Sequence, residues 1–379
     1  MADRNRSPRR LRRAALWPAL TMTCAVLVSG CASAGSVSTA KARLASSRAR
    51  APENVRGTWT ELHPPQNPLA RDSAGFTYDA ATGTVLLAGG KSGCGPDPTF
   101  YNDTWGLADG KWTRLHPANN GPGGEAFFTM TYDPASQQVV AVGIYTGCGT
   151  ATVMHFWNGS DWSLPPSTLA LPPPMSWSGL AYDSATGQLL LFGEAQTFDQ
   201  TTQSNLDVAE TWSWADGQWR ELSPTTEPPL LADASMAYDP ATRSVILFGG
   251  QPVRPTDGGG FGAPVDGTWS WNGSEWVQLT PPAHPSARTG SSLAYDPSLG
   301  GLVLFGGSTV DPGRGNVRPL NDMWLWEGGD WLPVKAPVMP SPRFFSQMTF
   351  DTASHELVLF GGALDNTADT NDAWVFRAR

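Results

Sequence analysis

The sequence predicts an all-β fold, a closed six-bladed β-propeller with four short antiparallel strands in each blade. Three observations predict it. The chain from Gly57 to Arg379 repeats at intervals of 50 to 57 residues, each repeat contains an aromatic-aspartate pair and an apolar run, and most repeats end in two tryptophan-bearing segments. A period of this length is typical of repeat architectures, in which neighbouring units cover one another.

The first two strands of each unit are marked by the aromatic-aspartate pair and the apolar run after it. The aromatic residues are Tyr78, Tyr132, Tyr182, Tyr238, Tyr295 and Phe350. Short turn sequences such as DPATRS follow them and favour tight hairpins. The apolar runs, VILFGG for example, are unbroken rather than alternating, which predicts strands covered on both faces by neighbouring blades.

The third and fourth strands carry the tryptophans. Four pairs lie seven residues apart, and His155 takes the first position of a fifth pair with Trp162. Because 15 of the 16 tryptophans after the amino-terminal segment fall on these repeated strands, we expect them to pack between blades. Trp177, in the Pro-rich segment LPPPMSWSG, is the exception and a candidate for ligand contact.

The ends of the repeat region predict how the ring closes. The segment GTWTELHPP matches the fourth strand of other units, whereas the final segment NDAWVFRAR matches a third strand and has no fourth strand after it. We therefore expect residues 59–62 to complete the last blade, so that the first and last units are joined and no open sheet edge separates them.

A glycine pair follows the second strand at Gly89-Gly90, Gly249-Gly250, Gly306-Gly307 and Gly361-Gly362. With the aromatic and tryptophan positions after it, this pattern resembles the kelch repeat, which is also found in the galactose oxidase propeller. The resemblance covers residues 57–379 and implies the propeller fold. The two histidines, two tyrosines and cysteine that galactose oxidase chemistry needs do not map onto this chain, and neither a metal nor another cofactor is predicted.

The first 56 residues are predicted to be a targeting and linking segment rather than part of the fold. Six arginines precede an apolar stretch of about fifteen residues, too short to span a bilayer, which ends in Val28-Ser29-Gly30-Cys31. This ending resembles a bacterial lipobox, so residues 1–30 are expected to be the signal peptide and Cys31 the lipidated residue. An ordinary secretory signal cleaved after Ala32 or Ala34, or a twin-arginine signal, is the alternative. Residues 31–56 then form a flexible tether to the membrane's extracellular face.

Cys94 and Cys148 are the two cysteines left after Cys24 and Cys31 are assigned to the signal and the lipid. They stand at equivalent positions of adjacent units, sixteen residues after the anchor tyrosine. An oxidising compartment favours a disulfide between them, with free thiols or a redox pair as the alternative.

The charge of the repeat region excludes one class of partner. From Gly57 onward, 14 Lys and Arg face 32 Asp and Glu, a net charge of −18. Such a surface repels phosphate backbones, so no nucleic acid is expected to bind.

The candidate ligand-binding residues lie on the face that carries the long loops between strands two and three and between strands four and one. Functional residues concentrate on such loops. Seven residues before the anchor aromatic stand Arg71, Arg288 and Arg343, in the three neighbouring blades one, five and six. Arg314 and Arg318 lie in the long loop of blade five. Arginines in this register look like those that line the ligand-facing rim of kelch domains; alternatively each packs into its own blade and bonds loop carbonyls.

These observations predict a cell-envelope-anchored scaffold that binds a protein or an anionic glycan on the long-loop face. The alternative function is a carbohydrate-active enzyme, an epimerase or lyase of acidic sugars, which would need a paired acid and base near the axis. No catalytic residue is assigned, because no spacing in the sequence brings such a pair together. Oxygen-rich residues in the last loop, Asp365 to Asp372, suit a calcium site, but Asn-Asp before strand three recurs in two other units and favours a structural turn.

Overall fold

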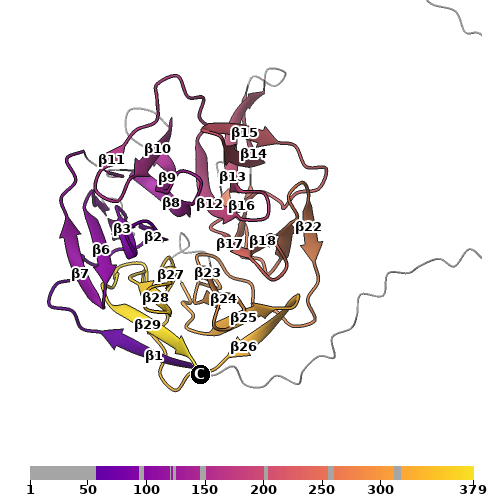
Figure 1. Cartoon of the computed structure of the whole chain (residues 1–379). Coiled ribbons are helices and arrows are strands. Elements are labelled where there is room, and N and C mark those ends of the chain that lie inside the picture. Colours follow the sequence, from indigo (N-terminus) through magenta and orange to yellow (C-terminus); the bar gives the residue numbers. More distant parts are fainter. Residues whose placement is uncertain are drawn as a thin grey trace, which may run out of the picture. The chain divides into compact units, whose positions relative to one another are not determined.

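The computed structural model describes residues 57–93, 98–119, 121–122, 125–145, 151–199, 204–254, 260–310 and 317–379. Within them every regular element is a strand, and six four-stranded antiparallel sheets stand around a common centre (Figure 1). The predicted six-bladed β-propeller is therefore confirmed. None of the described residues forms a helix with the length and hydrophobicity needed to cross a membrane.

Blades one to three follow the chain from the closure onward. Blade one contains β2 (Gly75–Asp79), β3 (Thr84–Ala88), β6 (Thr104–Ala108) and β7 (Lys111–Leu115). Blade two contains β8 (Glu125–Asp133), β9 (Gln138–Tyr145), β10 (Ala151–Trp157) and β11 (Trp162–Ser163). Blade three contains β12 (Met175–Asp183), β13 (Gln188–Asp199), β14 (Ser204–Ala215) and β15 (Gln218–Leu222).

Blades four to six complete the ring. Blade four contains β17 (Ser235–Asp239), β18 (Ser244–Phe248), β21 (Thr268–Trp271) and β22 (Trp276–Leu279). Blade five contains β23 (Ser292–Asp296), β24 (Gly301–Phe305), β25 (Met323–Glu327) and β26 (Asp330–Val334). Blade six contains β27 (Gln347–Asp351), β28 (Glu356–Phe360), β29 (Ala373–Ala378) and β1 (Gly57–Leu62).

The closure is the one that the sequence predicts. β1 pairs with β29 over six residues, from Gly57 opposite Ala378 to Leu62 opposite Ala373. Strand four of blade six thus comes from the start of the repeat region, and Figure 1 shows the two ends of that region side by side. Because this pairing joins the two ends of the ring, separating blade six from blade one requires breaking a complete strand ladder.

The blades differ where they reach the long-loop face. In blades two and three the first two strands continue toward this face, β12 and β13 to nine and twelve residues. Small additional sheets lie at blades one and four, made of β4 (Lys91–Ser92) with β5 (Thr99–Phe100), and of β16 (Leu231–Ala232), β19 (Gln251–Arg254) and β20 (Gly260–Phe261).

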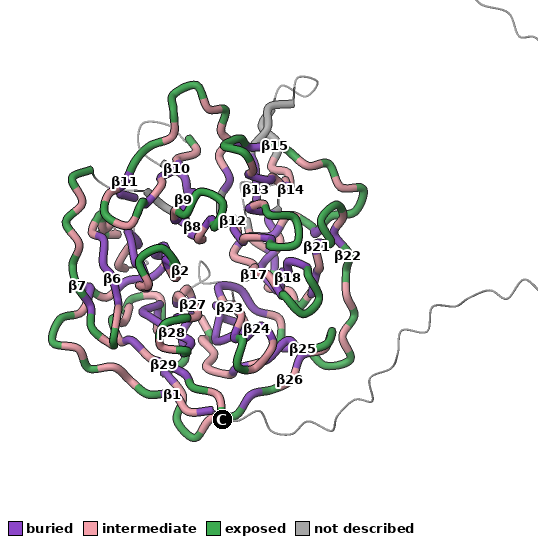
Figure 2. The backbone as a smooth tube through the Cα atoms, in the orientation of Figure 1, coloured by how far each residue is buried: buried purple, intermediate pink, exposed green. Residues whose placement is uncertain are grey.

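The core lies between the blades. Strand two of each blade is almost entirely buried, and exposure is concentrated in the hairpins and rim loops (Figure 2). The strand-four tryptophan of one blade packs on the strand-two phenylalanine of the blade before it, as with Trp331 on Phe248 and Trp112 on Phe360, both 5.1 Å between ring centroids. The inter-blade role expected for the tryptophans is confirmed at these positions.

The same tryptophans also donate hydrogen bonds to threonine hydroxyls across three blade interfaces. Nε1 of Trp331 donates to Thr268 Oγ1 of the preceding blade at 3.1 Å, and Trp162 and Trp276 bond Thr104 and Thr211 in the same way. The acceptor is always the residue before the first tryptophan of strand three. In blade six that residue is Ala373, and Trp112 Nε1 is buried with no acceptor among the described residues.

The six anchor aspartates serve the hairpins between strands one and two. Asp79 accepts hydrogen bonds from Ala81 N at 3.0 Å and Thr82 Oγ1 at 2.8 Å, and the other five accept from a backbone N–H and a hydroxyl of their own turn. This Asx-turn bonding explains why aspartate ends every first strand. The opposite, long-loop face is thus the variable one.

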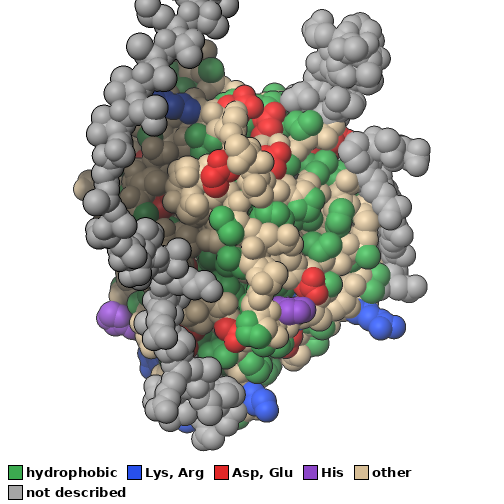
Figure 3. Space-filling view, turned by 90° about the vertical axis from the view of Figure 1, so that its right-hand side faces the viewer, with side chains coloured by type: hydrophobic (Ala, Val, Ile, Leu, Met, Phe, Trp, Pro, Cys, Tyr) green, Lys and Arg blue, Asp and Glu red, His purple; other side chains and the backbone are tan. Residues whose placement is uncertain are grey.

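The acidic composition does not produce one acidic patch on the flank shown in Figure 3, where acidic side chains are dispersed among neutral ones. Many of the body's carboxylates serve turns and ion pairs. They therefore contribute to structure as well as to net charge.

Candidate functional site

A cavity of about 600 Å³ occupies the central channel between the six innermost strands. Its lining residues extend from Ser73 and Phe345 at the long-loop face to Ala80, Pro134 and Thr352 in the hairpins of the other face. Ligand pockets usually have volumes of about 300–1,000 Å³. The channel is therefore large enough for a small or slender ligand.

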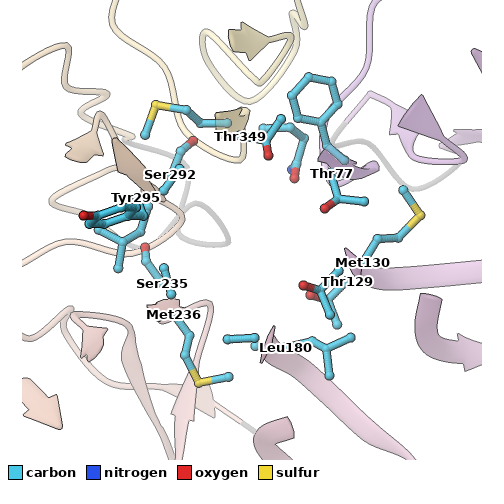
Figure 4. A pocket seen from close by; sticks show the side chains of 18 of the residues that line it. Thr77, Thr129, Met130, Leu180, Ser235, Met236, Ser292, Tyr295 and Thr349 are labelled. Carbon is cyan, nitrogen blue, oxygen red and sulfur yellow. The ribbon is translucent and has the colours of Figure 1, made fainter. Parts of the chain in front are cut away.

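The channel wall combines hydroxyl and apolar side chains. Thr77, Thr129, Ser235, Ser292 and Thr349 stand around one opening together with methionine and leucine side chains (Figure 4). Asp233 is the only charged side chain among the lining residues that the structure describes. Such a wall offers hydrogen bonds and apolar contact without a strong field of either sign.

Serine pairs connect the channel wall across two blade interfaces. Ser235 Oγ of blade four donates to Ser291 O of blade five at 2.7 Å, and Ser292 Oγ donates to Ser346 O of blade six at 2.6 Å. In each pair the two hydroxyl oxygens are also within hydrogen-bond distance, at 2.6 and 2.9 Å. These bonds fix neighbouring first strands relative to each other.

A main-chain collar surrounds part of the channel mouth at the long-loop face. It is formed by Ser73, Asp233, Gly290 and Phe345, each five residues before its anchor aromatic and each at positive φ, between 52° and 63°. Gly290 N donates to Asp233 O at 3.0 Å, Phe345 N to Gly290 O at 2.7 Å and Ser73 N to Phe345 O at 3.3 Å. Left-handed conformations at three non-glycine residues are costly and are often found at functional sites.

Blades two and three replace the collar with bulged strands. The equivalent positions in these blades are Phe127 and Trp177. At each of them the first strand has a bulge: two residues of β8 lie opposite Gly143, and two residues of β12 lie opposite Gly193. Such bulges change the direction of a strand near binding sites. Trp177 thus belongs to the channel mouth by its place in β12, while its side chain lies outside the described part of the structure.

The three arginines of the predicted binding arc are internal to their blades. Arg71, Arg288 and Arg343 are 1%, 0% and 0% exposed. Each forms a two-pronged ion pair with the aspartate two residues before the first tryptophan of strand three, as Arg343 Nη1 and Nη2 do with Asp372 at 2.6 and 2.8 Å. Asp103 and Asp322 are the partners in blades one and five.

Carbonyl and hydroxyl acceptors take the remaining donors. Arg343 Nη1 also donates to Gly361 O, Nε to Ser341 O and Nη2 to Ser341 Oγ, so all five N–H groups are used. Arg288 repeats this set. A ligand would have to displace an aspartate to reach either guanidinium. These contacts correspond to the structural alternative, and the three arginines are not retained as ligand-binding residues.

The arginine backbone also connects each of these blades to the one before it. Gly362 N of blade six donates to Arg71 O of blade one at 2.9 Å, and Gly250 and Gly307 bond Arg288 and Arg343 in the same way. A Cβ on Gly361 would lie 2.6 Å from Arg71 O, which explains the glycine there. The interfaces four-five, five-six and six-one therefore each contain an arginine clamp: a buried arginine that pairs with an aspartate of its own blade and whose carbonyl accepts a hydrogen bond from the preceding blade. The other three interfaces lack it.

The clamp lowers the pKa of its carboxylates. Burial alone would raise the pKa of Asp103, Asp322 and Asp372, but the hydrogen bonds and charge of the arginines lower all three below the ordinary value of 3.8. The aspartates are therefore ionised at neutral pH. Asp372, one of the residues considered for calcium, is an arginine partner.

The other predicted site residues divide into exposed and undescribed ones. Arg318 is exposed in the loop between β24 and β25, on the long-loop face. Arg314, Cys31, Cys94 and Cys148 lie outside the described residues. Among the described residues, no three His, Cys, Asp or Glu side chains gather as metal ligands. The ligand-contact prediction for Arg318 and the disulfide prediction both stay predictions.

Sequence reasoning missed Phe345, Asp233 and the channel hydroxyls. The repeat alignment does place the collar residues at one position, two residues after the arginine position. The six blades have Ser, Phe, Trp, Asp, Gly and Phe there, which share no chemistry. What they share is a place at the mouth, which only the closed ring defines.

Comparisons with known proteins support the fold. No protein-family model matches the sequence. The structure is similar to a solved structure of a protein named YjhT, with a TM-score of 0.58 and 16% sequence identity, over 83% of this chain and 99% of that one. At this identity the likeness concerns the fold alone.

Proposed function

We propose that this chain is an exported, envelope-anchored kelch-type propeller that acts as a binding scaffold, taking a glycan or protein ligand at the channel mouth on the long-loop face. The observation that carries the proposal is the channel itself: about 600 Å³, lined by hydroxyl and apolar side chains, and framed by the main-chain collar. Concave sites with a few placed polar groups are the usual form of a ligand site.

The wall chemistry favours a neutral, hydroxyl-rich ligand over an anionic one. The basic arc that suggested an anion is neutralised by Asp103, Asp322 and Asp372 inside the blades. No lysine or arginine occurs among the described lining residues. Serine and threonine hydroxyls can donate to and accept from sugar hydroxyls, and the Phe345 ring at the mouth offers an apolar face.

The same wall supports binding rather than turnover. An epimerase or lyase needs an acid and a base that converge on the substrate, and Asp233 is the only carboxylate among the described lining residues. The collar, the arginine clamps and the serine pairs hold blades four, five, six and one in fixed relation. A mouth fixed before binding reduces the entropic cost of ligand capture.

The topology also determines the face at which the chain enters the propeller. β29 runs from the long-loop face to the hairpin face and ends at Ala378, which pairs with Gly57. The chain therefore enters the propeller at the hairpin face. With Cys31 lipidated as the sequence predicts, the tether joins the propeller at the hairpin face, opposite the face that carries the channel mouth.

A binding screen of the full-length protein against glycans and cell-envelope polymers tests the proposal. We expect saturable binding without a new product by mass spectrometry, and an affinity at least tenfold lower in Phe345→Ala. Val338→Ala, an exposed residue outside the channel lining, is the matched control and should bind normally. Turnover of a bound ligand would show that the protein is an enzyme. An affinity unchanged in Phe345→Ala would show that the ligand binds at another site.

A further inference from the structure

Blade three carries a buried carboxyl group at the root of its extended strands. Glu194 follows Gly193 on β13, at the position where blades one, four, five and six have the second glycine of the pair. It lies opposite Ser176 of β12 and Ala209 of β14. The residue is 8% exposed, and its Oε2 atom has no hydrogen-bond partner among the described residues.

Blade three also lacks the arginine that blades one, five and six use. Met175 takes its register position and is buried. Glu210 occupies the position of the aspartate that pairs with arginine in those blades, and it accepts a hydrogen bond from Trp212 Nε1 at 2.6 Å. Burial raises the pKa of Glu210, against the effect of the Trp212 bond, and the charge of Glu221 adds to the increase.

Among the residues that the structure describes, the charged groups nearest to Glu194 are carboxylates. Asp207, two residues along β14 from its cross-strand partner, faces it. Glu210 lies on the opposite face of β14, with Glu227 nearby, and β16 contributes only Leu231 and Ala232. Burial, with the charge of Asp207, raises the pKa of Glu194 to about 7. The cluster therefore favours a neutral Glu194 at mildly acidic pH.

Glu194 stands next to the bulge at the channel mouth. The last β12 residue paired before the bulge, Ser176, is its direct partner, and Trp177 and Ser178 form the bulge. A carboxylate that ionises here must either stay dry beside Asp207 or reach water. Glu194 lies on the same face of β13 as Leu190 and Phe192, which pack against blade four, and both β12 and β13 contact β16 there. Water therefore reaches the carboxylate most directly if the mouth end of β12 and β13 moves away from β16.

We propose that protonation of Glu194 controls the packing of the mouth end of β12 and β13 against β16, so that this side of the mouth is closed when Glu194 is neutral and open when it is ionised. The consequence for ligand affinity rests on the function proposed above, whereas the switch does not. Blades five, six and one, with glycine in place of Glu194 and with the arginine clamp, have no such control.

Hydrogen-exchange mass spectrometry of the full-length protein at pH 6 and pH 8, corrected for intrinsic exchange rates, tests the switch without any ligand. In the wild type, the amides of 175–179 and 194–195 should lose protection by up to about tenfold at pH 8, one unit above the titration midpoint. In Glu194→Gln, which imitates the neutral acid, protection should be equal at both pH values. Glu194→Ala should also be pH-independent and replaces Gln if that variant does not fold.

Glu210→Gln is the matched control, because it neutralises a carboxyl on the other face of the same blade and should leave the pH effect intact. The peptides of β23 and β24 should show no change. Equal pH dependence in wild type and Glu194→Gln would overturn the proposal. A failed ligand screen with a positive exchange result would overturn the binding function and leave the switch standing.

Discussion

Arg343 and Asp372 lie 29 residues apart and form a two-pronged ion pair in blade six, with N···O distances of 2.6 and 2.8 Å. The arginine side chain is fully buried and the aspartate side chain is 19% exposed. The same pairing recurs in blades one and five. Removing one partner of a buried pair leaves an uncompensated charge, which makes the pair a sensitive point of the fold.

Arg343→Ala should therefore lower the free energy of unfolding by about 3–5 kcal/mol. Denaturant unfolding measures this change, and ligand affinity of the folded fraction should stay unchanged. Arg318→Ala, on an exposed arginine of the same face, should change stability by less than about 0.5 kcal/mol. A stable Arg343→Ala protein that has lost its ligand would restore the binding role of this arginine.

Stability should be greater at pH 5 than at either pH 3 or pH 8. The clamped aspartates have lowered pKa values, so their contribution is present above the ordinary value of 3.8 and is lost as the pH falls below it. Glu194 has the opposite sign: its raised pKa gives a contribution that is lost as the pH rises from 4.5 to about 7.

The two sides of this profile separate by mutation. Glu194→Gln should raise the free energy of unfolding at pH 8 by about 1–3 kcal/mol while leaving the acid side unchanged. Chemical denaturation at the three pH values gives the comparison. If the free energy of unfolding falls between pH 5 and pH 8 by the same amount in Glu194→Gln as in the wild type, other groups cause the decrease.

The tryptophan bonds between blades predict a gain and a loss. Thr268→Val keeps the shape but leaves Trp331 Nε1 without its acceptor, which should lower stability by about 1–3 kcal/mol. Ala373→Ser supplies a hydroxyl where Trp112 Nε1 has none, and should raise stability by about 0.5–1.5 kcal/mol. Thermal or denaturant unfolding of the two variants measures both. Loss of stability in Ala373→Ser would mean that the site has no room for the added oxygen.

Gly290→Ala should damage the collar. Gly290 has a φ of 63°, and a Cβ there would lie 2.7 Å from the Phe345 ring. We expect a loss of about 1–3 kcal/mol in stability and a lower affinity for any ligand of the mouth. Gly300→Ala, in the hairpin of the same blade at φ 70° with open space around its Cβ, controls for the backbone cost alone. Equal effects of the two variants would show that the collar contributes neither to stability nor to ligand binding.

Much of the fold could be predicted from local patterns. The hairpins depend on an aspartate and its own turn, strand two on a short apolar run, and the closure on one unmatched strand at each end. The pairing of Arg with Asp was readable as well, because Asp103, Asp322 and Asp372 occur in the same three units as the arginines. The site was less predictable, since the positions at the mouth share a place but no residue type.

By itself, the sequence determined the number of blades, their strands and the strand that closes the ring, because each depends on contacts that repeat from unit to unit. The tertiary structure decided what the differences between units mean. An arginine at a loop position has the same charge whether it faces a ligand or an aspartate, and only closing the blade brings Asp372 to Arg343. Likewise Glu194 became a buried acid only because blade four packs against its face of β13.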